Sequence, residues 1–160
     1  MLAFMEEEKG FKLNYLNKNT IKGEINGVQI YLITHSYPLV KDLTNIESIR
    51  MAGIPHIAAM KLNAIVGNET RLKDFIDIAF LSSLLSLDQM LEAYEIKYKT
   101  RNSVMVLKSL DFHEDINHLQ PIVLLGAKYK WKPIDKRIKQ MLTAHEKVFE
   151  SMNKDLSCMN

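Results

Sequence analysis

The chain has 160 residues and carries 21 Lys and Arg against 19 Asp and Glu, a net charge of +2. This length suits one domain with a real core, and so small a net charge does not by itself predict nucleic-acid binding. No apolar run reaches the roughly 18–20 residues that cross a bilayer, and acids at 6–8 replace the basic start of a signal peptide. We therefore expect a cytoplasmic protein without a membrane segment. The single cysteine, Cys158, excludes an internal disulfide.

The first third of the chain predicts a short helix and a β-hairpin. Residues 2–9 are typical of a helix end closed by Gly10. The segments 20–25 and 28–34 flank Asn26-Gly27, the dipeptide that best tolerates a type I′ turn. The second segment, VQIYLIT, is apolar at most positions, which predicts a strand covered on both faces. Because an isolated hairpin is only marginally stable, we expect a helix, another strand or another chain against it.

The remaining two thirds predict a loop with a brief extended piece at 49–51 and then helices. The expected helices span 57–67 and about 71–84, then start at Ser86, at Asn102 or Ser103, and close to Pro133. Ser86 with Gln89 is a capping box, and Pro133 suits a first helical turn. The last helix should carry an apolar stripe over Ile134, Ile138, Met141, Leu142, His145, Val148 and Phe149.

Three charged residues stand in apolar surroundings in the first two of these helices. Lys61 lies between Met60 and Leu62, while Asp74 and Asp77 flank Phe75-Ile76. Aspartates three residues apart share one helix face, and a buried carboxylate is costly unless it is paired. A contact between Lys61 and one of the aspartates is therefore expected. It is either an ion pair that joins two packed helices or part of a functional site.

A basic segment near the C-terminus suggests contact with nucleic acid. Basic residues alternate there with Tyr129 and Trp131, and they are Lys128, Lys130, Lys132, Lys136, Arg137 and Lys139. Such a segment suits an RNA backbone and a stacked base. Alternatively, the lysines form a solvated helix face and Trp131 anchors the helix in the core. The five histidines lack the spacing of a zinc site, and we expect no metal.

Several motifs together resemble the AbiEii/AbiGii nucleotidyltransferase toxins over about residues 20–150. In order, the motifs are AAMKLNAI, KDFIDIAFL, SLDQMLEAY, VLKSLDF with Asp115, and Trp131 followed by the 134–138 helix. The resemblance implies an α+β fold, in which a partial nucleotidyltransferase palm, a β-hairpin plus a short strand, precedes a mainly helical region. It also implies a bacterial toxin–antitoxin or abortive-infection protein that transfers nucleotides from an NTP with Mg²⁺, onto tRNA in some members. A cognate antitoxin is an implied partner.

The resemblance also assigns roles to residues and to regions. Lys61 matches the lysine of the family's AMKL motif, and Asp74 matches the aspartate of its RDxxDL motif, with Asp77 following. These groups would lie beside the nucleotide, where Arg71 and Lys73 would add phosphate contacts. The expected regions are the partial palm at 1–53, the helical region at 54–150 and a frayed tail at 151–160.

The chain departs from the family pattern where the family binds metal. The Gly-Gly-Ser/Thr turn and the Asp-x-Asp pair do not occur, and Tyr31 stands in the place of the third carboxylate. Pro55-His56 replaces the acid expected before the AAMK helix. The sequence therefore predicts a nucleotidyltransferase by descent that is inactive as this isolated chain. The alternative is a noncatalytic remnant that binds RNA or protein, with its exposed hairpin edge available to pair with another chain.

Overall fold

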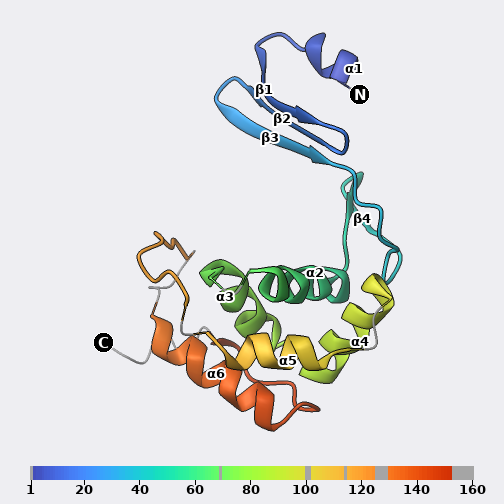
Figure 1. Cartoon of the computed structure of the whole chain (residues 1–160). Helices are drawn as coiled ribbons and strands as arrows, with labels where there is room; N and C mark the ends of the chain where they lie inside the picture. The colour runs from blue at the N-terminus through green and yellow to red at the C-terminus, as the bar shows by residue number, and fades with distance from the viewer. Residues whose placement is uncertain (1, 69, 100–101, 114, 125–129, 153–160) are drawn as a thin grey trace. The chain divides into compact units, whose positions relative to one another are not determined.

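The computed structural model describes residues 2–68, 70–99, 102–113, 115–124 and 130–152 (Figure 1). Its contacts divide the chain into two compact units, residues 1–37 and residues 38–160. The second unit thus begins upstream of the boundary expected at residue 54. Antiparallel strands precede five helices, α2 to α6, in the described residues, which confirms the α+β fold class.

The first unit is a three-stranded antiparallel sheet with a short helix before it. Its elements are α1 (Leu2–Glu6), β1 (Phe11–Asn17), β2 (Thr20–Ile25) and β3 (Val28–Ile33). Asn26 and Gly27 have φ of 50° and 83°, the left-handed backbone that a type I′ turn requires, so the hairpin is confirmed. β1 was not expected, and it supplies the further strand that the hairpin needs by pairing with β2.

The strand order β1-β2-β3 makes β3 an edge of this sheet. Val28, Tyr31 and Ile33 are each more than half exposed. The expectation that this strand is covered on both faces is therefore wrong for the described structure. Its apolar composition reflects an open surface of the sheet and not a buried position in it.

The second unit begins with a small ribbon and continues as packed helices. β4 (Thr44–Ile46) pairs antiparallel with β5 (Ile49–Met51), which confirms the extended piece at 49–51. The helices that follow are α2 (Ile54–Gly67), α3 (Leu72–Leu81), α4 (Leu87–Tyr98), α5 (Val104–Asp111) and α6 (Trp131–Thr143). Within the described ranges, no helix combines the length and the apolar character of a membrane-spanning segment.

The helix boundaries follow local signals closely. The Ser86 hydroxyl accepts a 3.2 Å hydrogen bond from the Gln89 backbone N–H, and the Gln89 side chain accepts one of 2.9 Å from the Ser86 backbone. The capping box of α4 is thus confirmed. α5 begins after Ser103 as expected, although the Ser103 side chain makes no capping bond.

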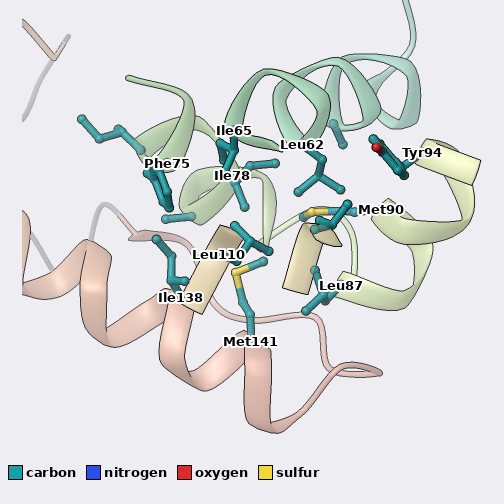
Figure 2. Close-up of a cluster of buried hydrophobic side chains, with 14 of the residues drawn as sticks. Leu62, Ile65, Phe75, Ile78, Leu87, Met90, Tyr94, Leu110, Ile138 and Met141 are labelled. Atoms are coloured by element: carbon teal, nitrogen blue, oxygen red, sulfur yellow. The ribbon is translucent and has the colours of Figure 1, made fainter. Parts of the chain in front are cut away.

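The core of the second unit lies between the helices (Figure 2). α2 contacts α3, α4 and α5, and α6 contacts α3 and α5. The side chains drawn at their meeting point are buried and include Leu62, Ile65, Phe75, Ile78, Met90, Leu110, Ile138 and Met141. Burial of each large aliphatic side chain stabilises the fold by about 1.5–3 kcal/mol. This packing holds α2 against α3, the pair of helices that carries Lys61 and the two aspartates.

The last helix ends earlier than the apolar stripe predicted. α6 stops at Thr143, so His145, Val148 and Phe149 lie beyond it. Backbone bonds to other helices replace the helical ladder there: the Phe149 N–H donates to the Ser82 carbonyl at 2.9 Å, and the Asp88 N–H donates to the His145 carbonyl at 3.1 Å. Met152 is fully buried, so this part of the expected tail packs on the protein, while residues 153–160 lie outside the described residues.

Candidate functional site

α2 and α3 bring Lys61, Asp74 and Asp77 together. The Lys61 ammonium lies 2.9 Å from Asp74 Oδ1 and 2.6 Å from Asp77 Oδ2. The three-residue spacing of the aspartates on α3 places both carboxylates toward α2, as helix geometry requires. The contact expected from the sequence is therefore present, and it bridges two packed helices.

The three members of this cluster differ in exposure. The Asp74 side chain is only 3% exposed, while those of Lys61 and Asp77 are 32% and 45% exposed. Arg71 approaches Asp74 from its other side, with 2.6 Å between Arg71 Nε and Asp74 Oδ2. That oxygen is buried and accepts no well-aligned hydrogen bond from the described residues, so Arg71 neutralises its charge without bonding it directly. Asp74 is the buried centre of the cluster and depends on two cations.

Lys61 is held in its charged form. Burial by itself lowers the pKa of the Lys61 ammonium, but hydrogen bonds and attraction from Asp74 and Asp77 raise it by more, so the net pKa lies above the ordinary 10.5. A lysine in this state neither accepts a proton nor acts as a nucleophile at neutral pH. It is suited to attracting an anion while it braces the two helices.

A pocket of about 350 Å³ opens beside this cluster. It is lined by the charged side chains of Lys61, Lys73 and Asp77 and by the apolar side chains of Ile76, Pro121, Ile122, Val123 and Leu124. The volume lies at the lower end of the range for small-molecule sites, and a few polar groups against an apolar wall are the usual composition of such sites. The lining carries two ammonium groups against one carboxylate, which favours an anionic ligand, and its aliphatic side chains offer a surface for a flat ring.

The described residues include no group of three His, Cys, Asp or Glu side chains placed to hold a metal ion. Asp74 and Asp77 are both engaged by Lys61, which removes them from the acids that would bind a cation. Tyr31, in the place of the expected carboxylate, is exposed and donates its hydroxyl to the Gln29 side chain at 3.0 Å. Asp74 and Asp77, each paired with Lys61, therefore do not fit Mg²⁺ in the part of the chain that the structure describes.

The basic segment near α6 is divided by the structure. Lys128 lies outside the described residues, Lys130 is the N-cap of α6, and Lys132 and Lys136 are exposed on the helix. Arg137 is instead buried: it donates to the Ser82 hydroxyl at 3.0 Å and to the Glu150 carbonyl at 2.9 Å.

Trp131 in the same segment packs inward. Its ring meets those of Phe75, His113 and His118 edge-on, with centroids 5.1–6.3 Å apart. These contacts agree with the alternative in which Trp131 anchors the last helix in the core and does not stack on a base. Lys132, Lys136 and Lys139 of the basic segment keep the exposure that contact with a large anion requires.

One buried lysine and its histidine partner were not predicted from the sequence. Lys97 on α4 is fully buried, with its ammonium 3.0 Å from His56 Nε2 and 3.4 Å from the Pro38 carbonyl, to which it donates. Burial lowers the pKa of Lys97. The burial of Lys97 could have been predicted, because position 97 continues the apolar stripe of α4 through Met90 and Tyr94 at helical spacing.

A family model described as "Nucleotidyl transferase AbiEii toxin, Type IV TA system" matches residues 6–151. No curated protein and no solved structure matches the chain. The family match includes β1, the hairpin, and all of α2 to α6, so it extends over most of both units.

Proposed function

Because the chain belongs to the AbiEii nucleotidyl transferase toxin family of type IV toxin–antitoxin systems, we propose that its α2–α3 pocket binds a nucleoside triphosphate. Membership in this family implies an NTP as the nucleotide donor and an antitoxin as a partner. The observation that carries the proposal is the presence of Lys61 and Lys73 in the lining of one pocket together with several aliphatic side chains. Phosphate oxygens suit the two ammonium groups, and the base suits the aliphatic part of the lining.

The residues of the pocket have separable tasks in this proposal. Lys73 is exposed and contacts phosphate as a point charge. Lys61 adds a second charge while Asp74 and Asp77 fix its position. Asp77 is half-exposed at the pocket wall and is placed to accept a hydrogen bond from a ligand hydroxyl. No proton transfer is required of any of them for binding.

We propose further that this chain alone binds the nucleotide without transferring it. Nucleotide transfer in such enzymes relies on carboxylates that hold Mg²⁺ and stabilise the attacked phosphate. Asp74 and Asp77 do not fit the ion, and the described residues include no other group of three potential metal ligands. Incubation of the purified chain with labelled NTP, Mg²⁺ and tRNA should therefore leave the RNA unlabelled, and labelled RNA would contradict this part of the proposal.

Titration of the protein with fluorescent analogues of ATP, CTP, GTP and UTP tests the binding. Loss of one charged contact to phosphate weakens binding by about 1.5–3 kcal/mol, which is about ten- to a hundredfold in affinity. We expect this loss for Lys73→Ala with an unchanged free energy of unfolding, and no loss for Lys132→Ala on α6. Absence of binding for all four analogues would overturn the proposal. Lys73 separates binding from stability because, unlike Lys61, it does not bridge α2 and α3 in the ion pairs described above.

A second candidate function is binding of RNA at the outer face of α6. Lys132, Lys136 and Lys139 line a hollow of about 450 Å³ together with Asp135, Gln140 and Thr143. The one acid in it, Asp135, is already engaged by Lys139 at 3.0 Å and by His113 at 2.7 Å. The face therefore keeps a positive charge.

Salt dependence distinguishes this candidate from the first. Each phosphate neutralised contributes about −0.7 to the slope of log affinity against log salt for a single strand. Lys136→Ala should weaken tRNA binding and reduce that slope, while Lys108→Ala on α5 should leave both unchanged. Equal effects of the two variants would show that α6 does not carry the RNA contact.

A further inference from the structure

We propose that one face of the three-stranded sheet in residues 11–33 is an interface between two copies of this chain. The register of the strands separates the side chains of this sheet into two sets. One set, here called the apolar face, comprises Phe11, Leu13, Leu16, Ile21, Gly23, Ile25, Val28, Ile30 and Leu32. The opposite set, the polar face, includes Lys12, Tyr15, Lys22, Glu24, Gln29 and Tyr31.

A bulge in β1 creates the apolar face. Leu13 is opposite Gly23 and Leu16 is opposite Ile21, with an irregularity between Leu13 and Tyr15. In a regular strand, residues three apart point to opposite faces. The extra residue at the bulge returns Leu16 to the face of Leu13. Without it, the leucines would be divided between the two faces.

Contacts across the sheet agree with this assignment. The Lys22 ammonium lies over the rings of Tyr15 and Tyr31, 5.4 and 5.5 Å from their centroids, which places all three on the polar face. On the other side, the Phe11 ring lies over Gly23 so closely that a β-carbon there would clash with Phe11 Cε2. The ring fills the space that glycine leaves, so the middle of the apolar face is occupied by Phe11.

The described elements of the first unit leave the apolar face open at several positions. Leu13, Leu16 and Val28 are 42%, 53% and 65% exposed. A contiguous apolar surface on a sheet normally packs against another element, because its hydration is unfavourable. The five-residue helix α1 contacts β1 but leaves these side chains exposed.

A second copy is the occupant that the charge distribution favours. A two-fold interface sets the same surface against itself, so a charged group in it is brought close to its own copy. The nine positions of the apolar face include no charged and no polar side chain, whereas the polar face carries Lys12, Lys22 and Glu24. Two such sheets pack face to face at about 10 Å, with aliphatic side chains between them.

The size of the face predicts the strength of the association. Three strands of six residues cover roughly 14 by 20 Å, or about 290 Å² per copy. Two copies would bury about 600 Å², less than the roughly 1,200 Å² of a stable complex. We therefore expect a reversible dimer whose population rises with protein concentration.

Sedimentation velocity of the full chain over a range of concentrations tests this interface. Val28→Lys and Leu16→Lys place charges on the apolar face at exposed positions and should shift the equilibrium at least tenfold toward monomer. Ile33→Lys is the matched control, since Ile33 is also on β3, is 62% exposed and lies on the polar face. It should leave the dimer unchanged.

A cross-link gives a second readout that does not depend on charge. Ile30 lies in the middle row of the apolar face, opposite Gly23. In a Cys158→Ser background, Ile30→Cys should yield a disulfide-linked dimer on mild oxidation, whereas Tyr31→Cys should not. A protein that is monomeric at every concentration overturns the proposal. A dimer that persists in both Val28→Lys and Leu16→Lys also overturns it, as does a dimer that Ile33→Lys dissociates to the same extent. Either result would assign the contact to another surface.

Discussion

Replacing Lys61 with Met should destabilise the helical unit by about 2 kcal/mol, because a hydrogen bond between charged groups contributes roughly 1.5–3 kcal/mol. The substitution removes the 2.9 Å bond to Asp74, whose side chain is almost fully buried. Asp74 is then left with Arg71, which is half-exposed and poorly aligned with it. The partial exposure of Lys61 keeps the loss below the about 3–5 kcal/mol typical of a fully buried pair.

Urea unfolding followed by circular dichroism measures this loss, with two variants for comparison. Asp77→Ala removes the exposed partner of Lys61 and should lower the free energy of unfolding by less than about 1 kcal/mol. Lys73→Met changes an exposed lysine on the same helix and should alter it by no more than about 0.5 kcal/mol. Because the pKa of Lys61 is raised, its contribution should be constant at neutral pH and be lost only above the ordinary lysine pKa of 10.5.

The ordering of the three variants is the decisive result. Lys61→Met must lower the free energy of unfolding more than Asp77→Ala, and Asp77→Ala at least as much as Lys73→Met. If Lys61→Met equals the Lys73→Met control, the buried Asp74 does not depend on Lys61. The ion pair would then contribute nothing measurable to stability, and its role would have to be sought in ligand binding alone.

Three further predictions concern other parts of the chain. Ser86→Ala should destabilise α4 by about 1 kcal/mol in urea unfolding, because it removes one half of the capping box, and Ser86→Asp should recover most of that loss. Gly23→Ala should destabilise the sheet by about 1–3 kcal/mol through overpacking against Phe11, measured as faster amide exchange in β2. Burial by itself raises the pKa of Asp135, but Lys139 and His113 lower it by more, so the net pKa lies below the ordinary 3.8. The ionised carboxylate should therefore stabilise the fold above that pH, and this stabilisation should be lost as the pH falls below it. The free energies of unfolding of the wild type and of Asp135→Asn should accordingly converge in acid.

Local signals in the sequence were sufficient where a structural feature depends on a few adjacent residues. Asn26-Gly27 predicts the hairpin turn because few other residues tolerate its backbone angles, and Ser86 with Gln89 predicts the start of α4 because both partners of the capping box are close in sequence. The Lys61 contact was also predictable, since charges in apolar surroundings require partners and only two aspartates stand at matching positions.

β1 escaped prediction because the alternation of its apolar residues through Phe11, Leu13 and Tyr15 breaks at Leu16, which follows Tyr15 directly. The bulge puts Leu13 and Leu16 on one face, and a period of two is the signal by which a half-buried strand is recognised. The end of α6 escaped for a related reason. The apolar stripe continues to Phe149, but the backbone N–H of that residue bonds to Ser82, far away in the chain, and no local pattern reports such a bond.

What the sequence determined by itself was the family, the α+β order and the identity of the charged residues that need partners, because each depends on residue type and short-range spacing. Tertiary structure alone decided which charges are buried. Arg137 and Lys97 stand in helical patterns that predict solvent exposure as readily as burial, and only packing against Ser82 or His56 encloses them. Burial is a property of all the elements that surround a side chain, and those elements come from distant parts of the chain.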